Sequence, residues 1–299
     1  PAQSFLISTG VTDMFVSKLD SSGNLVWAKS VGNGVGYQTG QSVTVDSSGN
    51  VYTTGRFKGT VDFDPGAGTA NLTSNGYNDV FVSKLDSSGD LVWAKSFGST
   101  ELDWGQSIAV DSSGNVYTTG DFTGTVDFDP GAGTANLTSN GGRDVFVSKL
   151  DSSGDLVWAK SFGSSGGTID DDSGHSVAVD SSGNVYTTGR FRNTVDFDPG
   201  AGTTNLTANA SDIFLSKLDS SGDLVWAKSF GDTGTDGGYS VAVDSSGNVY
   251  TAGYFSDTVD FDPGSGTAEL TSTSGVDAFV LKLDSSGNLA TANPAGVSV

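Results

Sequence analysis

The sequence predicts an all-β fold made of repeated four-stranded antiparallel sheets. A block of about 66 residues recurs along the chain, and residues 79–98 (DVFVSKLDSSGDLVWAKSFG) are repeated letter for letter at residues 144–163. Short runs of β-branched and aromatic residues flank each D-S-S-G segment, as in hairpins. The 43 glycines among 299 residues suit short strands joined by tight turns.

The first half of each repeat predicts a hairpin of two strands, which we call strands A and B. In the repeat used as the example, strand A covers residues 42–45 and strand B covers residues 51–54. Between them, Asp46 accepts backbone hydrogen bonds at the start of the turn. Gly49 takes the positive φ that closes a type I turn with a bulge.

The second half predicts another hairpin with the same turn chemistry. Strand C covers residues 81–85 and strand D covers residues 91–95, with the turn at residues 86–90. An insert at residues 59–76 separates strands B and C. Its Pro-Gly pair fits the centre of a type II turn, so the insert forms its own small hairpin or extends strand B.

A single such sheet is apolar on both faces and cannot bury itself alone. Stacking the sheets around an axis solves this problem, which predicts a β-propeller-like fold of four to five blades. In an antiparallel meander, the D-S-S-G turns lie at one end of each sheet. The inserts and the variable D–A loops lie at the other end, at residues 33–40, 99–105, 164–174 and 232–238. Any recognition surface is expected at this loop end.

The pattern S-V-A-V-D-S-S-G-N-V-Y-T-T-G, followed by D-V-F-V-S-K-L-D-S-S-G-D-L-V-W, resembles the bacterial β-propeller repeats called SBBP. It is also similar to NHL-type blades with an insert between the second and third strands. The F-D-P-G-A-G-T element at Phe63, Phe128 and Phe197 is similar to inserts in long repeat proteins of environmental bacteria. The resemblance implies an extracellular or envelope role and brings no catalytic residues.

The repeats do not divide evenly into blades. We expect one domain over residues 1–299, with blades at residues 41–98, 106–163, 175–231 and 239–299 and an extra C–D hairpin within residues 1–40. The last blade is weak, because its strand D at residues 289–292 has lost the tryptophan. Three explanations stay open: the extra hairpin closes the ring, it pairs head-to-tail with another subunit, or the chain is a fragment of a longer array.

Composition limits the partners. The net charge of −21 disfavours nucleic acid and anionic membranes as partners. The absence of cysteine excludes disulfides and thiolate metal sites. No apolar run is long enough for a membrane-spanning helix, so membrane insertion is not expected. The acidic, cysteine-free composition, rich in Gly, Ser, Thr, Asn and Asp, favours a secreted or surface-exposed microbial protein.

Paired aspartates in the inserts are the best candidate for a metal site. Two aspartates at alternate positions on a strand share a face, and calcium prefers such carboxylate oxygens. The alternative is pairing with Lys84 or Lys95 and their equivalents, or solvation. The candidate calcium ligands are Asp62, Asp64, Asp127, Asp129, Asp196, Asp198, Asp260 and Asp262.

Four residues near the variable loops are candidates for ligand binding: Tyr37, Trp104, His175 and Tyr239. The rings of Tyr37, Trp104 and Tyr239 offer faces to a glycan. His175 and Tyr239 occupy equivalent positions before strand A that vary between repeats. The tryptophans of strand D, one in each of four repeats, are instead expected to fill the space between blades.

The sequence therefore predicts a non-catalytic, extracellular structural or binding protein that self-assembles through its extra hairpin. The alternatives are a glycan-binding lectin and a fragment of a longer surface protein. Near-identical repeats leave few unique polar groups for an active site. His175 lies near Asp170, Asp171 and Asp172, which read equally well as a solvated acidic loop, and nothing in the sequence marks a particular serine as a nucleophile.

Overall fold

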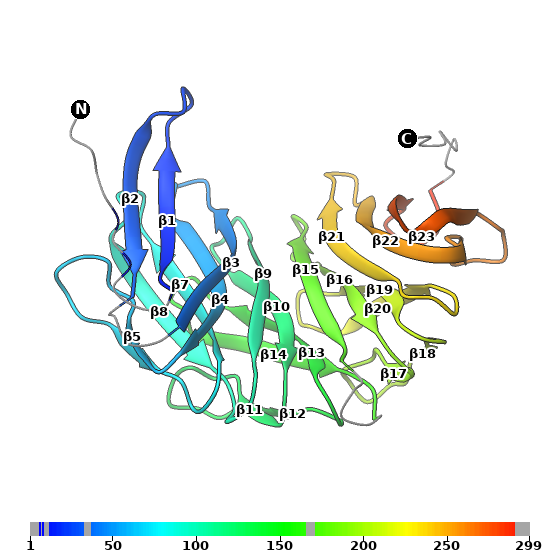
Figure 1. Cartoon of the computed structure of the whole chain (residues 1–299), viewed down its shortest axis with the longest axis horizontal. Coiled ribbons are helices and arrows are strands. Elements are labelled where there is room, and N and C mark those ends of the chain that lie inside the picture. The colour runs from blue at the N-terminus through cyan, green and yellow to red at the C-terminus, as the bar shows by residue number, and fades with distance from the viewer. Residues whose placement is uncertain (1–5, 7, 9–11, 33–36, 166–170, 291–299) are drawn as a thin grey trace. The chain divides into compact units, whose positions relative to one another are not determined.

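The computed structural model describes residues 6, 8, 12–32, 37–165 and 171–290, and every regular element in them is a strand (Figure 1). This confirms the all-β prediction. Residues 291 and 292 of the predicted last strand D, and Asp170, lie outside the described residues. There is no helix in the described part of the chain that could cross a membrane.

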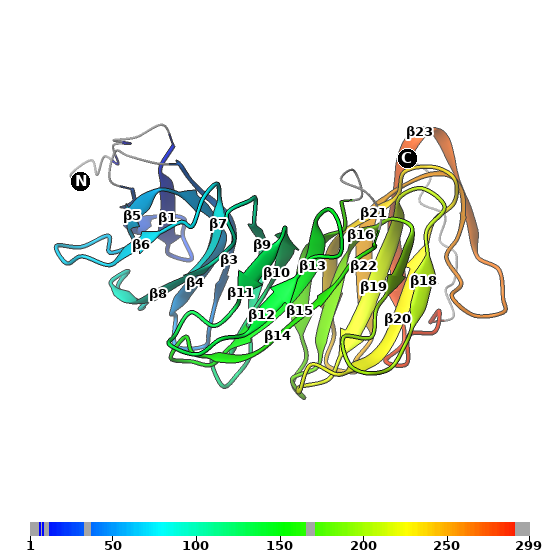
Figure 2. The ribbon, with the colours of Figure 1, turned by 90° about the horizontal axis from the view of Figure 1, so that it is seen from below.

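The repeats form the predicted antiparallel sheets in the strand order A-B-C-D. Figure 2 shows the four strands β15, β16, β19 and β20 lying side by side. The first four-stranded sheet contains β3 (Tyr37–Val45), β4 (Val51–Lys58), β7 (Asp79–Leu85) and β8 (Leu91–Phe97). The second contains β9 (Trp104–Val110), β10 (Val116–Phe122), β13 (Asp144–Leu150) and β14 (Leu156–Phe162). The third contains β15 (Ser173–Val179), β16 (Val185–Phe191), β19 (Asp212–Leu218) and β20 (Leu224–Phe230).

The two ends of the chain carry incomplete sheets. At the start, β1 (Met14–Leu19) and β2 (Leu25–Val31) form a two-stranded sheet that has only strands C and D. The last sheet has three strands, β21 (Gly237–Val243), β22 (Val249–Asp260) and β23 (Glu269–Leu283). Among the described residues, its strand D is reduced to a bridge between Leu283 and Leu289.

The inserts realise both predicted alternatives. Three of them form separate hairpins: β5 (Thr60–Asp62) with β6 (Asn71–Thr73), β11 (Thr125–Asp127) with β12 (Asn136–Thr138), and β17 (Thr194–Asp196) with β18 (Asn205–Thr207). In the last repeat the insert instead extends β22 and β23, which stay paired as far as Asp260 and Glu269. A sequence of one pattern therefore adopts two related strand arrangements.

The chain divides into two compact units. The first contains residues 1–139 and 146–159, and the second contains residues 140–145 and 160–299. The boundary passes through β13 and β14. The expected single domain over residues 1–299 stays a prediction.

Each D-S-S-G turn is closed by its first aspartate, as predicted. In the turn between β7 and β8, Oδ1 of Asp86 accepts hydrogen bonds from the backbone N–H groups of Ser88 at 2.8 Å and Asp90 at 3.0 Å. Gly89 has a φ of 82°, which favours glycine. These bonds are local, so the turn forms wherever the five residues recur.

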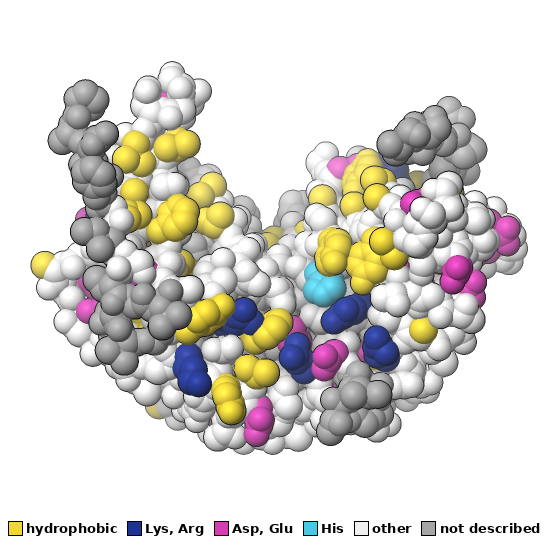
Figure 3. All heavy atoms as spheres, in the orientation of Figure 1, with side chains coloured by type: hydrophobic (Ala, Val, Ile, Leu, Met, Phe, Trp, Pro, Cys, Tyr) yellow, Lys and Arg dark blue, Asp and Glu magenta, His cyan; other side chains and the backbone are white. Residues whose placement is uncertain are grey.

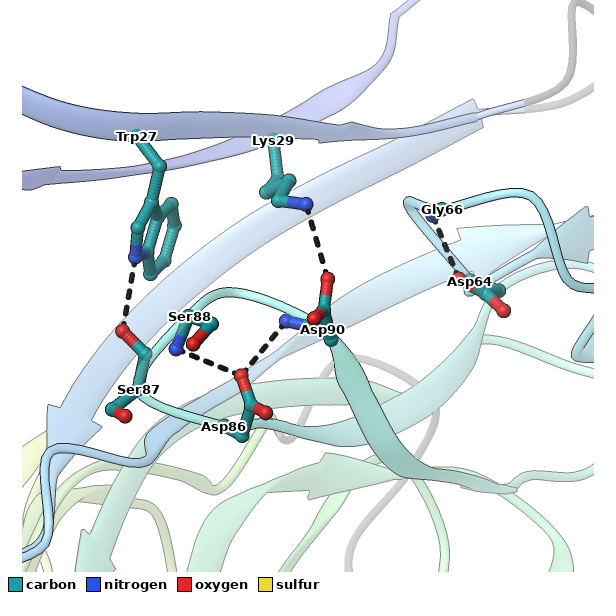
Figure 4. A network of polar contacts seen from close by, with 8 residues as sticks. All are labelled: Trp27, Lys29, Asp64, Gly66, Asp86, Ser87, Ser88 and Asp90. Carbon is teal, nitrogen blue, oxygen red and sulfur yellow. Dashed lines mark hydrogen bonds and ion pairs between the residues drawn. The ribbon is translucent and has the colours of Figure 1, made fainter.

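Within the first unit, strand D of one sheet packs on the C–D turn of the next sheet. Trp27 donates its indole N–H to the carbonyl of Ser87 at 3.2 Å, and Lys29 lies 3.4 Å from the carboxylate of Asp90 (Figure 4). A Cβ at Gly89 would lie 3.1 Å from the Trp27 ring, so the ring packs directly on the turn. Trp93 makes the same bond to Ser152 at 3.1 Å. Trp27 and Trp93 therefore lie half-buried between sheets of the first unit, as the sequence predicted.

Phenylalanines form the core between sheets. Phe81 on strand C is fully buried, and its ring centroid lies 5.0 Å from that of Phe63, the aromatic residue of the F-D-P-G insert. Between the first and second four-stranded sheets, the ring centroid of Phe97 on strand D lies 4.9 Å from that of Phe128 and 5.5 Å from that of Phe146. The insert thus contributes one ring to the core of its repeat, which explains the constant phenylalanine before Asp-Pro-Gly.

Candidate functional site

Every sheet with strands A and B carries a β-bulge at the loop end of strand A. Between β3 and β4, Gly40 pairs with Gly55 and Ser42 pairs with Thr54, so Gln41 has no partner in the register. The equivalent bulged residues are Gln106, His175 and Tyr239. Bulges often re-aim a side chain beside a functional site. The four bulged residues vary while their neighbours on strand A repeat.

Strand B has a second variable position at the same end. It lies between a constant glycine and a constant phenylalanine and is occupied by Arg56, Asp121, Arg190 and Tyr254. The register places this residue opposite a third variable residue on strand A, so that Thr39 faces Arg56 and Trp104 faces Asp121. Sequence reasoning missed the strand B position, although its variation between constant neighbours was a readable signal.

In the first unit, an arginine joins two of the predicted ligand-binding residues. The guanidinium carbon of Arg56 lies 4.2 Å from the Trp104 ring centroid and 5.5 Å from that of Tyr37. Arg56 also donates to the Tyr37 hydroxyl at 3.4 Å. Hydrogen bonding by Thr39, with the Arg56 hydrogen bond and charge, lowers the pKa of Tyr37. The amide of Gln41 donates to that of Gln106 at 3.4 Å.

In the second unit, the structure brings together the other two predicted residues. The ring centroids of His175 and Tyr239 are 5.4 Å apart, and the Tyr254 ring lies 5.2 Å beyond Tyr239. Tyr239 is 61% exposed. Figure 3 shows the histidine next to hydrophobic side chains on this surface. The arrangement is a short aromatic row with one open ring.

Burial keeps His175 neutral at pH 7. Desolvation lowers its pKa, the nearby Arg190 charge lowers it further, and a bond to the Gly238 carbonyl opposes both. Nδ1 lies 2.8 Å from that carbonyl oxygen. A carbonyl only accepts, so Nδ1 carries the proton and Nε2 is the acceptor. The imidazole is oriented by backbone rather than by a carboxylate.

The aspartates near His175 have structural partners. Asp172 is 1% exposed, which corrects its reading as part of a solvated loop. Its two oxygens accept backbone N–H groups from Ser164 at 2.7 Å and Arg192 at 2.8 Å. Asp171 lies 3.8 Å from Arg143 in an ion pair. Buried backbone donors near the loop account for the burial of Asp172.

The candidate calcium ligands cap the turns of the inserts. Asp62 ends β5, and its Oδ1 accepts the N–H groups of Asp64 at 3.0 Å and Ala70 at 2.8 Å. Asp64 accepts the N–H of Gly66 at 2.7 Å. The same three bonds recur in the other inserts, at Asp127 with Asp129, Asp196 with Asp198, and Asp260 with Asp262.

The lysines expected to neutralise these aspartates lie elsewhere. Lys84 is 5.2 Å from the Tyr52 ring centroid and donates to the Ser152 carbonyl at 3.3 Å. Lys95 pairs with Asp155 at 3.6 Å. Pairing with Lys84 or Lys95 was therefore wrong, because backbone N–H groups compensate the carboxylates instead. In the described part of the chain, no group of three or more His, Asp or Glu side chains is placed to hold a metal ion. The calcium site stays a prediction.

A different set of aspartates is buried at the loop end. Asp79 at the start of strand C is 1% exposed, and Asp103 before the next strand A is fully buried. Burial, together with the charge of Asp103, raises the pKa of Asp79 to about 7, against the effect of a hydrogen bond from Asn75. Burial also raises the pKa values of the two equivalent residues, Asp144 and Asp212, to about 7.

These shifts set the pH dependence of folding. A carboxyl whose pKa is about 7 in the folded state and 3.8 unfolded releases its proton on unfolding between those values. The free energy of unfolding therefore falls as the pH rises from about 4 to 7, by up to about 1.4 kcal/mol per pH unit for each group. The D-S-S-G aspartates act oppositely. Hydrogen bonds within the turn lower the pKa of Asp86, so its stabilising effect is lost as the pH falls.

Comparison with known proteins identifies the repeat. The SBBP beta-propeller repeat matches residues 26–56, 92–124, 157–190 and 225–254. A WD repeat-containing protein of Acanthamoeba polyphaga mimivirus, described as uncharacterized, is 26% identical over 255 residues, covering 74% of this chain and 18% of the relative. Regulatory protein FlaEY of Caulobacter vibrioides is 28% identical over 177 residues, covering 58% of this chain and 18% of the relative.

The chain thus spans about a fifth of the length of these curated relatives. A crystal structure of a protein of unknown function from Bacteroides caccae aligns with a TM-score of 0.33 and 8% sequence identity. The alignment covers 90% of this chain and 85% of the Bacteroides caccae chain. The predicted relationship to SBBP repeats is confirmed by the four repeat matches.

Proposed function

The chain is a beta-propeller repeat protein of the SBBP type, and we propose that it is a non-catalytic binding protein that acts outside the cell or on its surface. The observation that carries this proposal is the contrast within each sheet. The turns, the core and the residues that join neighbouring sheets repeat, whereas the bulged position of strand A and the variable position of strand B change chemical class. Rigid strands with changing side chains at one end form a platform for recognition.

The surroundings of His175 support binding rather than catalysis. Its partners in the described structure are the Gly238 carbonyl and the Tyr239 ring, so no serine, cysteine or carboxylate is hydrogen-bonded to the imidazole there. A hydrolase would lose activity on His175→Ala. We expect no turnover of p-nitrophenyl acetate or p-nitrophenyl glycosides by the unmodified chain or by His175→Ala. Turnover by the unmodified chain that disappears in His175→Ala would overturn the non-catalytic proposal.

A glycan is the ligand class that the aromatic row fits best. An exposed ring face stacks on the apolar face of a sugar, and Tyr239 is held in place by Tyr254 and His175. The bulged position holds Gln in two repeats, His in one and Tyr in one, so the expected stoichiometry is one aromatic site per chain.

Isothermal titration with chitohexaose, cellohexaose and laminarihexaose tests this proposal. We expect one of these probes to bind with one site per chain, and Tyr239→Ala to weaken binding at least tenfold. Tyr77→Ala is the matched control, because Tyr77 is also exposed, at 57%, but lies before strand C beside Lys58. Equal losses in both variants, or no binding of any probe, would reject the glycan site.

Self-association through the N-terminal hairpin stays a second prediction. It is supported by the exposure of Phe15, at 67%. It is weakened by the sequence of the last repeat, where Thr291, Asn293 and Ala295 replace the tryptophan, lysine and phenylalanine with which strand D docks elsewhere. Light scattering across a wide concentration range tests it, and a constant monomer mass would exclude a head-to-tail polymer.

A further inference from the structure

The arginines of the chain lie at the loop ends of their sheets. Five lysines on strand C and four on strand D recur at constant positions of the repeat. The four arginines, Arg56, Arg143, Arg190 and Arg192, instead occupy positions that change between repeats. In a chain with a net charge of −21, basic side chains at variable positions are candidates for binding an anion.

Three of these arginines surround one short segment of the second unit, residues 171–173. The Arg143 carbonyl accepts the backbone N–H of Asp172 at 3.0 Å. The backbone N–H of Arg192 donates to Oδ1 of Asp172 at 2.8 Å, and Arg190 pairs with Ser173 in the register of β15 and β16. The three side chains therefore leave the backbone within a few residues of the same segment.

The fold does not need arginine at these three positions. Asp103 and Asp236, the equivalents of Asp172, make the same backbone bonds, to the carbonyls of Asn78 at 2.9 Å and Ser211 at 2.8 Å. The positions equivalent to Arg190 and Arg192 hold Asp121 and Thr123 in one repeat, and Tyr254 and Ser256 in the other. Since the framework forms without them, the arginine side chains are available for another role.

Little in the described structure neutralises these arginines. Both oxygens of the buried Asp172 accept backbone N–H groups, from Ser164 and Arg192. Asp171 lies 3.8 Å from Arg143, and a long ion pair on partly exposed side chains contributes little. Nε of Arg190 is buried without a hydrogen-bond partner in the described structure. A ligand carboxylate would give Arg190 the acceptor that the fold does not.

The equivalent arginine of the first unit is occupied by a ring instead. The guanidinium carbon of Arg56 lies 4.2 Å from the centroid of the Trp104 ring. Gly237 stands at the equivalent of Trp104 in the second unit, so no indole covers Arg190. A guanidinium group presents N–H donors in a planar fork that matches the two oxygens of a carboxylate.

The aromatic row lies beside the arginines of the second unit. Arg190 is on β16, which pairs with β15, the strand of His175. After burial, the Arg190 charge contributes to the lowered pKa of His175, so the two side chains are close. Figure 3 shows Lys and Arg side chains next to the histidine and its hydrophobic neighbours. A sugar ring stacked on Tyr239 would therefore hold its substituents near guanidinium groups.

We propose that this surface, formed by Arg143, Arg190, Arg192 and the aromatic row, binds an acidic polysaccharide through the carboxylates of its uronic acid residues. The inference rests on the glycan binding proposed above and specifies the class of glycan. A uronic acid offers an apolar ring face to Tyr239 and a planar carboxylate to the arginines. A neutral sugar uses the ring alone and therefore binds more weakly.

The overall negative charge of the chain does not prevent this binding. Charges are screened over about 8 Å at physiological ionic strength. The D-S-S-G aspartates lie at the opposite end of each sheet, and a seven-residue strand such as β16 spans about 23 Å. The arginines therefore dominate the field at their own end, and uronate binding should weaken as salt is added.

Isothermal titration of the full chain with hexagalacturonate and hexamannuronate tests the inference. EDTA in the buffer prevents calcium from bridging the ligand to aspartates. We expect one of the two uronates to bind with one site per chain, at least tenfold more tightly than the neutral hexasaccharides, and high salt to remove this advantage.

Arginine variants separate the surface from general charge attraction. Arg190→Gln and Arg192→Gln should each weaken uronate binding at least tenfold and leave binding of the neutral hexasaccharides unchanged. Arg56→Gln is the matched control, because it removes the same charge at the equivalent position of the first unit, and it should leave uronate binding almost unchanged. Circular dichroism checks that each variant is folded.

Four results would overturn the inference. Uronate binding that is no tighter than neutral binding would reject it and leave the glycan proposal standing, whereas no binding of any hexasaccharide would reject both. Equal losses in Arg56→Gln and Arg190→Gln would indicate general charge attraction. Oligothymidylate that binds as tightly as the uronates, with the same dependence on Arg190, would assign the surface to nucleic acid.

Discussion

Phe15 and Phe81 occupy the same position of strand C in two repeats, but their surroundings differ. Replacing each by alanine in a separate variant therefore measures the effect of burial alone. Phe81 is fully buried between Gly55 and Phe63, whereas Phe15 is 67% exposed. Removing a buried phenylalanine costs about 3–5 kcal/mol, from lost burial and the remaining cavity. Changing an exposed side chain shifts stability by about 0.5 kcal/mol or less.

Phe81→Ala should therefore lower the folded-to-unfolded ratio about a thousandfold, at about 1.4 kcal/mol per tenfold change, and Phe15→Ala should leave it almost unchanged. Urea denaturation followed by tryptophan fluorescence measures both. Phe146→Ala, at another fully buried equivalent, should reproduce the larger loss. Phe81→Leu keeps most of the volume and provides a variant that still folds.

The reasoning would be refuted if Phe15→Ala cost as much as Phe81→Ala. That result means that the exposed face of β1 is covered in solution, and analytical ultracentrifugation of the same sample would then reveal the covering copy. A loss below about 1 kcal/mol for Phe81→Ala would contradict the burial itself.

Three further predictions concern stability. The free energy of unfolding, measured by urea titration, should be greater at pH 5 than at pH 7.5. Asp79→Asn should reduce this difference, because the pKa of Asp79 is about 7. If the variant shows the same difference between the two pH values, Asp79 is not its source. Asp62→Ala should lower the free energy of unfolding by about 1–2 kcal/mol, because two backbone N–H groups lose their acceptor, and Asp62→Asn should lower it less. If calcium raises the Tm of the unmodified chain but not of Asp62→Ala, that result would instead establish the metal site. Trp93→Phe should lower the free energy of unfolding by about 1 kcal/mol, because the hydrogen bond to Ser152 is lost. An unchanged Tm would show that this hydrogen bond does not stabilise the fold.

Much of the architecture was predictable because its causes are local. The Asp86 carboxylate closes its turn through residues two and four positions away, so five letters of sequence suffice to place a hairpin. Repetition then allows the sheets to be inferred from one another. Local pattern did not decide the insert, since the same pattern forms a separate hairpin at residues 60–73 and extends β22 in the last repeat.

The candidate site was predictable only in part. The variable position before strand A led to His175 and Tyr239, and loop aromatics led to Tyr37 and Trp104. Arg56 was missed, because its contact with Trp104 joins residues 48 positions apart across two sheets. The bulge at this end was also missed, since it is a property of strand pairing.

The sequence by itself thus determined the repeat, the turns and the strands, which depend on hydrogen bonds between near neighbours. Tertiary structure alone decided which identical side chains are buried, which aspartates share a buried site and which rings meet at the loop end. The physical reason is that burial depends on the adjacent sheet. Phe15 and Phe81 occupy the same sequence pattern, and only the strands packed over Phe81 distinguish them.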